Sequence, residues 1–310
     1  MSYLLPKIKA CLCLIALLGI FPARTIYASL QVINLESTQD SYISRQEPDK
    51  NFSQEKRLIL QSDSDPNNQT KILLKFDLSK SSLPTDAVIS QATLILTSLD
   101  NTSGESFTIY PLTKEWEQAT VNWNNVPNFD PDNSIALTTG SPKSKMEADL
   151  TSLVTSWHQG ESTNNGLMIA GPADQEYNHA FAGIQNLDNK PTLRIQYEKP
   201  AHITDINVRS DWPDQAIVSW RTDKKTDSFI RFGTSENYGQ TTGTEDLQTS
   251  HAVTIKGLDP DTNYHYQIRV QDESGIVSTS NNQTFTTQPL LAEPEEPEED
   301  DFESDFPTEE

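Results

Sequence analysis

The feature that most limits what this chain can fold into is a repeated alternation of apolar and polar residues over short runs. In ILLKFDL, the apolar residues Ile72, Leu74 and Phe76 share one face and Lys75 lies on the other. ATLILTSL, FTIY and LRIQY alternate in the same way, and clusters of Asn, Asp, Ser, Gly and Pro divide the runs. Such patterns are typical of antiparallel strands packed as a β-sandwich. The sequence therefore predicts an all-β protein.

One segment departs from this alternation. In DLTSLVTSWHQG (residues 149–160), the apolar residues follow the spacing of one helix face: Leu150, Leu153, Val154 and Trp157. Asp149 or Thr151 can cap the start of this helix, and Gly160 can end it. We expect one short helix that closes an end or edge of the sandwich, with Trp157 buried beneath it.

A second set of strands follows near residue 200. AIVSW, SFIRFG, HAVTIKGL and NYHYQIRV fall within about ninety residues, which is the length of an immunoglobulin-like sandwich. In GLDPDTNY, Tyr264 stands where its phenol can reach back to a nearby backbone group, as in a tyrosine corner. We expect two adjoining modules, residues 29–199 and 200–288.

The two ends of the chain differ from these modules. Residues 1–28 carry Lys7 and Lys9, then an apolar run, and have the layout of a secretory signal peptide with cleavage after Ala28. The apolar run is shorter than the roughly 20 residues of a spanning helix, so a membrane anchor is the weaker alternative. Residues 289–310 are predicted to be a disordered acidic tail.

The two ends of the chain predict the location of the protein. Both cysteines, Cys11 and Cys13, lie in the signal segment, so the mature chain would be held by its apolar cores alone in an oxidising compartment. We expect a secreted, extracellular protein that is not inserted in a membrane after cleavage. It could remain associated with the cell surface.

Charge and motifs exclude several functions. The formal net charge of −22 excludes nucleic-acid binding by general electrostatics. The sequence has no G-x-S-x-G elbow, P-loop or GxGxxG motif, and no HExxH motif for zinc. We therefore do not expect an enzyme. We also expect the protein to be a monomer.

The second module resembles a fibronectin type III domain. The resemblance rests on Trp220 and on the pattern Leu258-x-Pro260-x-Thr262-x-Tyr264. SFIRFGTSENYG, followed by SHAVTIKGL, is similar to the variant that precedes the catalytic domain of purple acid phosphatases. No histidine- and aspartate-rich metal motif follows here, so phosphatase activity is not expected. The resemblance implies a spacer, or a docking module for a protein partner.

The first module resembles the DNRLRE-type carbohydrate-binding modules, which are carbohydrate-binding module family 96. Matching pieces occur in order: DSYIS, ILLKFDLS, AVISQATLIL, WEQATVNWNNVP, ADLTSLVTSW and NNGLMIAG. The resemblance implies a jelly-roll β-sandwich on a secreted multi-domain protein, with members that bind acidic polysaccharides such as alginate. It implies binding and not catalysis.

Two groups of aromatic residues are candidates for contact with a sugar. Trp116 and Trp123 could form a stacking platform or belong to the core. Trp123 stands beside Val121, which favours the core, so Trp116 is the better candidate for binding. Tyr177, His179 and Phe181 share one face of a strand, which is either interior or a sugar-binding strip.

An acidic polysaccharide would also need positive charge or a bridging cation, because residues 29–200 hold 13 basic against 22 acidic residues. Lys56, Arg57 and Lys75 are the predicted basic contacts, and the wider patch would add Arg45, Lys50 and Lys71.

A structural calcium ion could take oxygen ligands from Asp40, Asn51 and Asp149. The alternatives are an Asx-turn for Asp40 and a helix cap for Asp149.

The sequence thus predicts a secreted, non-catalytic protein whose first module binds extracellular or cell-wall polysaccharide. The alternative is a structural or adhesion stalk of the cell surface with no glycan ligand. An exposed groove of aromatic and basic residues on the first module would favour binding. A buried Trp116 under a covering loop would favour the stalk.

Overall fold

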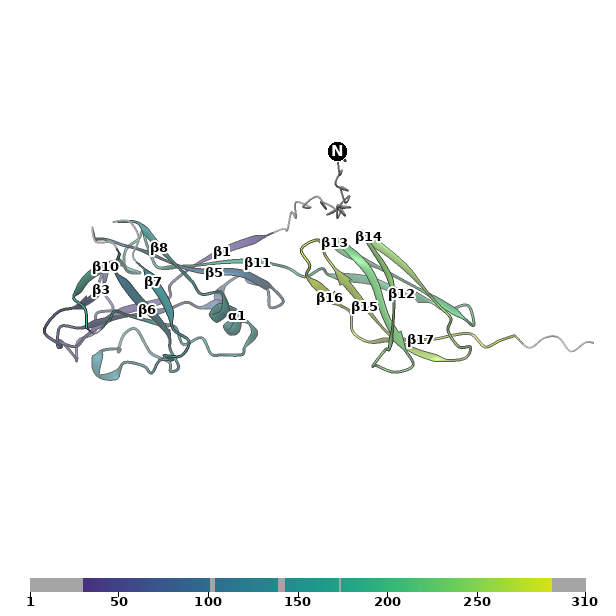
Figure 1. Ribbon diagram of the computed structural model, residues 1–310, viewed down its shortest axis with the longest axis horizontal. Coiled ribbons are helices and arrows are strands. Elements are labelled where there is room, and N and C mark those ends of the chain that lie inside the picture. Colours follow the sequence, from purple (N-terminus) through teal and green to yellow (C-terminus); the bar gives the residue numbers. More distant parts are fainter. Residues whose placement is uncertain (1–29, 101–103, 139–142, 173, 292–310) are drawn as a thin grey trace, which may run out of the picture.

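The computed structural model describes residues 30–100, 104–138, 143–172 and 174–291. Its elements are nearly all strands, arranged as two β-sandwiches in chain order (Figure 1). The predicted signal segment with Ala28, and the acidic tail from residue 292 on, lie outside the described residues. The all-β fold class is confirmed.

The first domain is a sandwich of antiparallel sheets. A four-stranded sheet has the order β1 (Gln31–Glu36), β11 (Thr192–Glu198), β5 (Val88–Thr97), β8 (Lys145–Asp149). A five-stranded sheet has the order β2 (Gln39–Ser44), β4 (Thr70–Lys75), β9 (Leu167–Ala170), β6 (Ser106–Pro111), β7 (Ile135–Thr138). The strands β10 (Tyr177–Ala182) and β3 (Arg57–Ser62) form a further pair.

The core of this domain lies between the sheets. Ile72 and Leu74 enter it from β4, while Leu94 and Ile195 enter from β5 and β11, and all four side chains are fully buried. This is the face that the alternation in ILLKFDL predicts. After Lys75 the strand ends, and Asp77 caps the short 3-10 helix η1 (Leu78–Lys80) by accepting the N–H of Ser79.

The predicted helix is α1 (Thr151–Gln159), and it is the one α-helix of the described residues. Val154 and Trp157 are buried in the core, and Leu150 just before the helix joins them. Gly160 ends the helix in the left-handed conformation, with φ of 74°, which glycine adopts without steric cost. The helix prediction is therefore confirmed, including its C-terminal glycine.

Residues 199–202 join the two domains. The second domain consists of β12 (Ile203–Arg209), β13 (Gln215–Gly233), β14 (Gln240–Lys256), β15 (Asn263–Gln271), β16 (Val277–Thr279) and β17 (Gln283–Thr286). The long strands β13 and β14 pair along most of their length, with register shifts around Thr226. Trp220, Tyr266 and Ile268 form the centre of a separate core.

The tyrosine corner is present. The backbone N–H of Asp259 donates to the phenol oxygen of Tyr264 over 2.9 Å, and the Tyr264 ring is buried against Phe285. The bond ties the turn before β15 to the strand itself, as GLDPDTNY predicts.

This contact gives a first test. Tyr264→Phe removes the acceptor and leaves the Asp259 N–H without its partner, so we expect the second domain to lose about 1–2 kcal/mol of unfolding free energy. Tyr238→Phe is the matched control, because its phenol makes an exposed 3.3 Å contact with Asn282. Calorimetry of both variants should show a lower second-domain transition for Tyr264→Phe alone. Equal shifts in the two variants would contradict this account.

Candidate functional site

The outer face of the five-stranded sheet is covered in part by one long segment. We call residues 112–128 the tryptophan loop. Ile43, Leu73 and Met168 stand on β2, β4 and β9 and are buried outside the main core. They pack with three buried residues of the loop, Leu112, Trp116 and Val121, in a second apolar cluster. The sheet therefore has an apolar cluster on each side, and the loop supplies the outer one.

Polar contacts hold the tryptophan loop in place. The side-chain amide of Asn51 donates to the carbonyls of Gln118 and Val121 over 2.8 and 2.7 Å. The indole N–H of Trp116 donates to the carbonyl of Asn165 over 3.0 Å. The loop is thus bound both to the segment after β2 and to the segment before β9.

The two tryptophans exchange the roles that the sequence suggested. Trp116 is only 6% exposed, so it has no ring face free for a sugar, and the prediction that it is the freer ring is wrong. Trp123 is half-buried and stands in the 3-10 helix η2 (Trp123–Asn125), not in a strand with Val121. Asn122 caps this turn with its side chain, and the alternation therefore ends after Val121.

Beside the covered area lies a group of aromatic and basic residues. Lys71 stands on β4, and its ammonium lies 5.1 Å from the ring centre of Trp123 and 5.9 Å from that of Phe129. Tyr110 of β6 packs on Phe129 with ring centres 4.9 Å apart. Phe129 is 38% exposed, and Trp123, Lys71 and Tyr110 are half-buried. We call Lys71, Tyr110, Trp123 and Phe129 the Lys71 cluster.

A second cation acts on this cluster. Arg45 follows β2, is exposed, and donates to the carbonyl of Pro66 over 3.0 Å. Burial lowers the pKa of Lys71, and the positive charge of Arg45 lowers it further. Within the described residues, neither base has an ion pair with a carboxylate, whereas five others of this domain do: Lys50, Arg57, Lys80, Lys190 and Arg194.

The three predicted basic contacts, Lys56, Arg57 and Lys75, do not lie in the Lys71 cluster. Arg57 begins β3 and its guanidinium lies 3.3 Å from the carboxylate of Asp100. Lys56, which precedes it, is exposed. Lys75 ends β4 beside a shallow hollow of about 390 Å³ that also borders Asp77 and Trp157. None of these contacts involves the Lys71 cluster.

The second aromatic group is interior. Tyr177, His179 and Phe181 of β10 are 7%, 0% and 0% exposed, and each ring meets Phe107 within the core. The alternation predicted their common face correctly, but their burial contradicts a sugar-binding strip. The interior-strand alternative holds.

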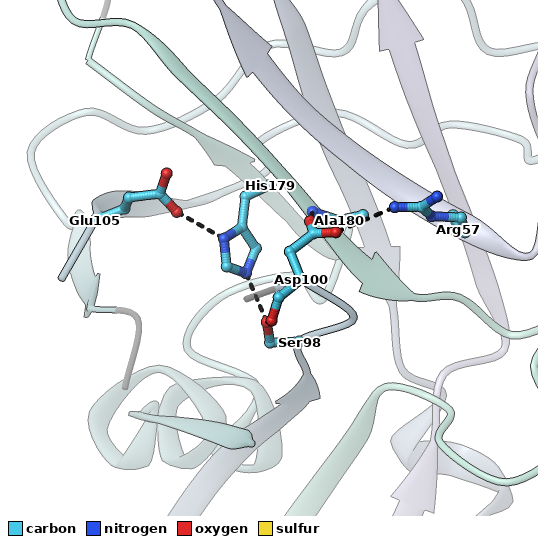
Figure 2. Close-up of polar contacts among 6 residues, drawn as sticks. All are labelled: Arg57, Ser98, Asp100, Glu105, His179 and Ala180. Atoms are coloured by element: carbon cyan, nitrogen blue, oxygen red, sulfur yellow. Dashed lines mark hydrogen bonds and ion pairs between the residues drawn. The ribbon is translucent and has the colours of Figure 1, made fainter. Parts of the chain in front are cut away.

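His179 connects two polar side chains that the sequence did not single out (Figure 2). Its Nε2 lies 3.0 Å from the hydroxyl of Ser98, and its Nδ1 lies 2.6 Å from a carboxylate oxygen of Glu105. Nearby, Asp100 accepts the backbone N–H of Ala180 and pairs with Arg57. This network ties the end of β5 and the start of β6 to β10.

The order Ser98–His179–Glu105 has the connectivity of a hydrolytic triad. A serine nucleophile must meet its substrate, however, and Ser98 is 2% exposed while His179 is fully buried. The network is therefore a buried structural one, in which each polar group is satisfied.

The three predicted calcium ligands lie on different elements and bind protein donors. Asp149 accepts the backbone N–H and the hydroxyl of Thr151, the first residue of α1, and so stabilises the start of the helix. It acts from one position before the N-cap residue, which is Leu150. Asp40 lies within β2 and accepts the backbone N–H of Ile184, so the Asx-turn alternative is wrong. Asn51 holds the tryptophan loop. Calcium binding stays a prediction.

Among the residues that the structure covers, no three His, Cys, Asp or Glu side chains are close enough together to hold a metal ion. Nor does any helix in those residues have the length and apolar character needed to cross a membrane.

Comparison with known proteins identifies both domains. The family model of carbohydrate-binding module family 96 matches residues 31–197, which is more than half of the chain. The model of the purple acid phosphatase N-terminal domain matches residues 200–287. A comparison with curated proteins found no significant match.

Solved structures match parts of the chain. A computationally redesigned β-sandwich protein is 24% identical over 30% of this chain and 97% of its own, with a TM-score of 0.24. The sensor domain of the anti-sigma factor RsgI4 of Pseudobacteroides cellulosolvens is 21% identical over 30% and 98%, with a TM-score of 0.23. A human fibronectin type III domain from KIAA0970 is 17% identical over 31% and 77%, with a TM-score of 0.24.

The role of the Asn51 hydrogen bonds in holding the tryptophan loop can be tested directly. Asn51→Ala leaves the carbonyls of Gln118 and Val121 without these donors, and it also removes the acceptor of the Ser53 N–H. We therefore expect a loss of about 1–3 kcal/mol in unfolding free energy. Asn124→Ala, which removes an exposed contact with Asp49, is the control. Protease digestion should cut the loop faster in Asn51→Ala than in the control. Equal rates of cleavage would show that Asn51 does not hold the loop.

Asp40 makes stability depend on pH. Burial raises its pKa to about 6, against an ordinary value of 3.8. Between these two values the unfolded chain loses a proton that the folded chain keeps, so this group lowers stability as pH rises from about 4 to about 6. Above pH 6 its unfavourable contribution is constant.

Asp40→Asn removes this contribution while an amide oxygen can still accept the Ile184 N–H. We expect the variant to gain up to about 3 kcal/mol relative to the wild type at pH 7, and little at pH 4. Thermal unfolding at both pH values measures this difference. A gain of the same size at pH 4 and pH 7 would contradict the ionisation argument.

Proposed function

We propose a function from one premise: the chain belongs to carbohydrate-binding module family 96, whose model matches residues 31–197. In this proposal the protein is secreted and binds an acidic extracellular or cell-wall polysaccharide without cleaving it. The binding surface is the Lys71 cluster together with Arg45. The second domain acts as a spacer, or as a docking module for another protein.

The observation that supports this best is the pair of cations without carboxylate partners. In a chain with a formal charge of −22, Lys71 and Arg45 have no ion pair among the described residues and repel each other. A sugar carboxylate or sulfate between them would relieve this repulsion and form charge-assisted hydrogen bonds. An anionic ligand would therefore raise the pKa of Lys71 towards its ordinary value.

The aromatic residues add the second half of a sugar site. The exposed part of Phe129, with the half-buried Trp123, offers ring surface on which the C–H face of a pyranose can stack. The Lys71 ammonium lies within 5.9 Å of the centres of both rings, so one sugar unit could contact a ring and a cation together. This is the combination of aromatic and basic residues that separates glycan binding from a purely structural role.

A structural stalk is the second candidate, and one observation favours it. Trp116 of the tryptophan loop is buried against the sheet, and the loop covers part of the sheet face on which a glycan could lie. If the protein is a structural stalk, Trp123 and Phe129 serve only to cover the outer face of the five-stranded sheet.

Binding assays with variants separate the two candidates. We expect the full chain to be retarded in gels that contain alginate or pectin. Lys71→Ala and Phe129→Ala should each weaken binding about 5- to 20-fold, because each removes about 1–2 kcal/mol of contact. Lys80→Ala is the matched control, since Lys80 is exposed and paired with Asp77 elsewhere on the domain.

The salt dependence provides a further check. Binding through Lys71 and Arg45 should weaken as the salt concentration rises, because exposed charge pairs are screened. If no acidic polysaccharide retards the chain at low salt, the stalk candidate replaces this proposal.

A further inference from the structure

A cleft of about 620 Å³ opens beside helix α1. Its walls are the end of β6, the segment before β7, the helix, and the residues before β9. A volume of this size falls within the range of small-molecule and sugar sites, about 300–1,000 Å³. None of the lining residues belongs to the Lys71 cluster.

The lining of this cleft has the chemistry of a sugar site. It is acidic, whereas the Lys71 cluster is basic. Leu153, Ile135 and Trp157 provide apolar surface, and serine and threonine hydroxyls surround it. Asp130 and Asp132 add two carboxylates. No lysine, arginine or histidine is among the described residues that line the cleft. The cleft therefore favours a ligand with many hydroxyl groups and no negative charge.

One carboxylate is fixed in its charged state. Asp130 accepts the side-chain amide of Asn133 over 2.7 Å and the backbone N–H of Asp132 over 2.9 Å. These bonds, that of the Asn133 side chain first, lower the pKa of Asp130. Its charge persists to acidic pH and would repel a uronate or sulfate ligand.

A buried amide in the same lining lacks a partner. Asn165 is 6% exposed, and its side-chain oxygen has no hydrogen-bond donor among the described residues. An unpaired buried acceptor is costly, and native proteins rarely keep one without a reason. The oxygen is enclosed, so the hydroxyl of a ligand in the cleft could supply the missing donor once the amide group rotates towards the cleft. This second observation is independent of the acidic side chains.

We propose that the cleft between α1 and the segment before β7 is a second carbohydrate site, which takes an uncharged hexopyranose unit. Asn165 and the carboxylates of Asp130 and Asp132 would bind its hydroxyls, and the apolar face of the sugar would lie against Leu153. The first site would then bind acidic units of a glycan, and this cleft would bind neutral ones. The inference does not depend on the Lys71 cluster.

The test uses the full chain and calorimetric titration with cellohexaose, mannohexaose and N-acetylchitohexaose, with oligogalacturonate as the acidic comparison. Ser152 is an exposed residue of α1 that lines the cleft, so Ser152→Trp should block it without disturbing the core. Gln159→Trp, an exposed residue of the same helix outside the lining, is the matched control. Asn165→Leu removes the unpaired amide.

We expect at least one uncharged hexasaccharide to bind. Ser152→Trp should weaken it more than 10-fold and Asn165→Leu more than 5-fold, while Gln159→Trp and Lys71→Ala stay within twofold of the wild type. Circular dichroism melts establish that each variant is folded, and Ser152→Trp alone suffices if Asn165→Leu is not.

Two results would overturn the proposal: no uncharged hexasaccharide binds, or one binds equally well to folded Ser152→Trp. Loss of neutral-sugar binding in Lys71→Ala would instead assign that binding to the first site, and so also overturn it. The effect of Lys71→Ala on oligogalacturonate binding reports on the proposed function, so the two proposals can fail separately.

Discussion

The amide of Asn51 determines much of what this protein presents to a ligand. Its two hydrogen bonds to the carbonyls of Gln118 and Val121 hold the tryptophan loop against the outer face of the five-stranded sheet. The indole of Trp116 completes this attachment by bonding to the segment before β9. Because the loop is held there, Trp116 becomes core, and Trp123 and Phe129 reach the surface beside Lys71.

The tryptophan loop contributes residues to two surfaces of different charge. On one side lies the Lys71 cluster, where two cations have no carboxylate partners among the described residues. Asn165, whose carbonyl accepts the Trp116 indole, also lines the acidic cleft beside α1. A heteropolysaccharide with acidic and neutral units offers ligands for both surfaces. The acidic character of the domain as a whole would keep binding specific to these two places.

Much of the fold follows from local sequence patterns, whereas the candidate site does so only in part. Alternation placed Ile72, Leu74 and Tyr177 on their correct faces, and the helical spacing with Gly160 located α1. Alternation in FTIY also implied that Tyr110 faces away from Phe107. The exposure of Trp123 and burial of Trp116 depend on Asn51, 65 or more residues away in the chain, which no local pattern reveals. The Ser98–His179–Glu105 network also joins residues far apart in the chain, because Ser98 and Glu105 lie 81 and 74 positions from His179.

The central claim is that Lys71 is the cation that meets an acidic sugar. The most direct measurement is NMR titration of the chain with its lysine amines labelled by reductive ¹³C-methylation, using oligogalacturonate or oligoalginate as ligand. The account predicts that the Lys71 signal moves first and that its pKa rises on binding, while the signal of Lys80 stays in place. Saturable binding with an unmoved Lys71 signal, or shifts confined to other lysines, would contradict it.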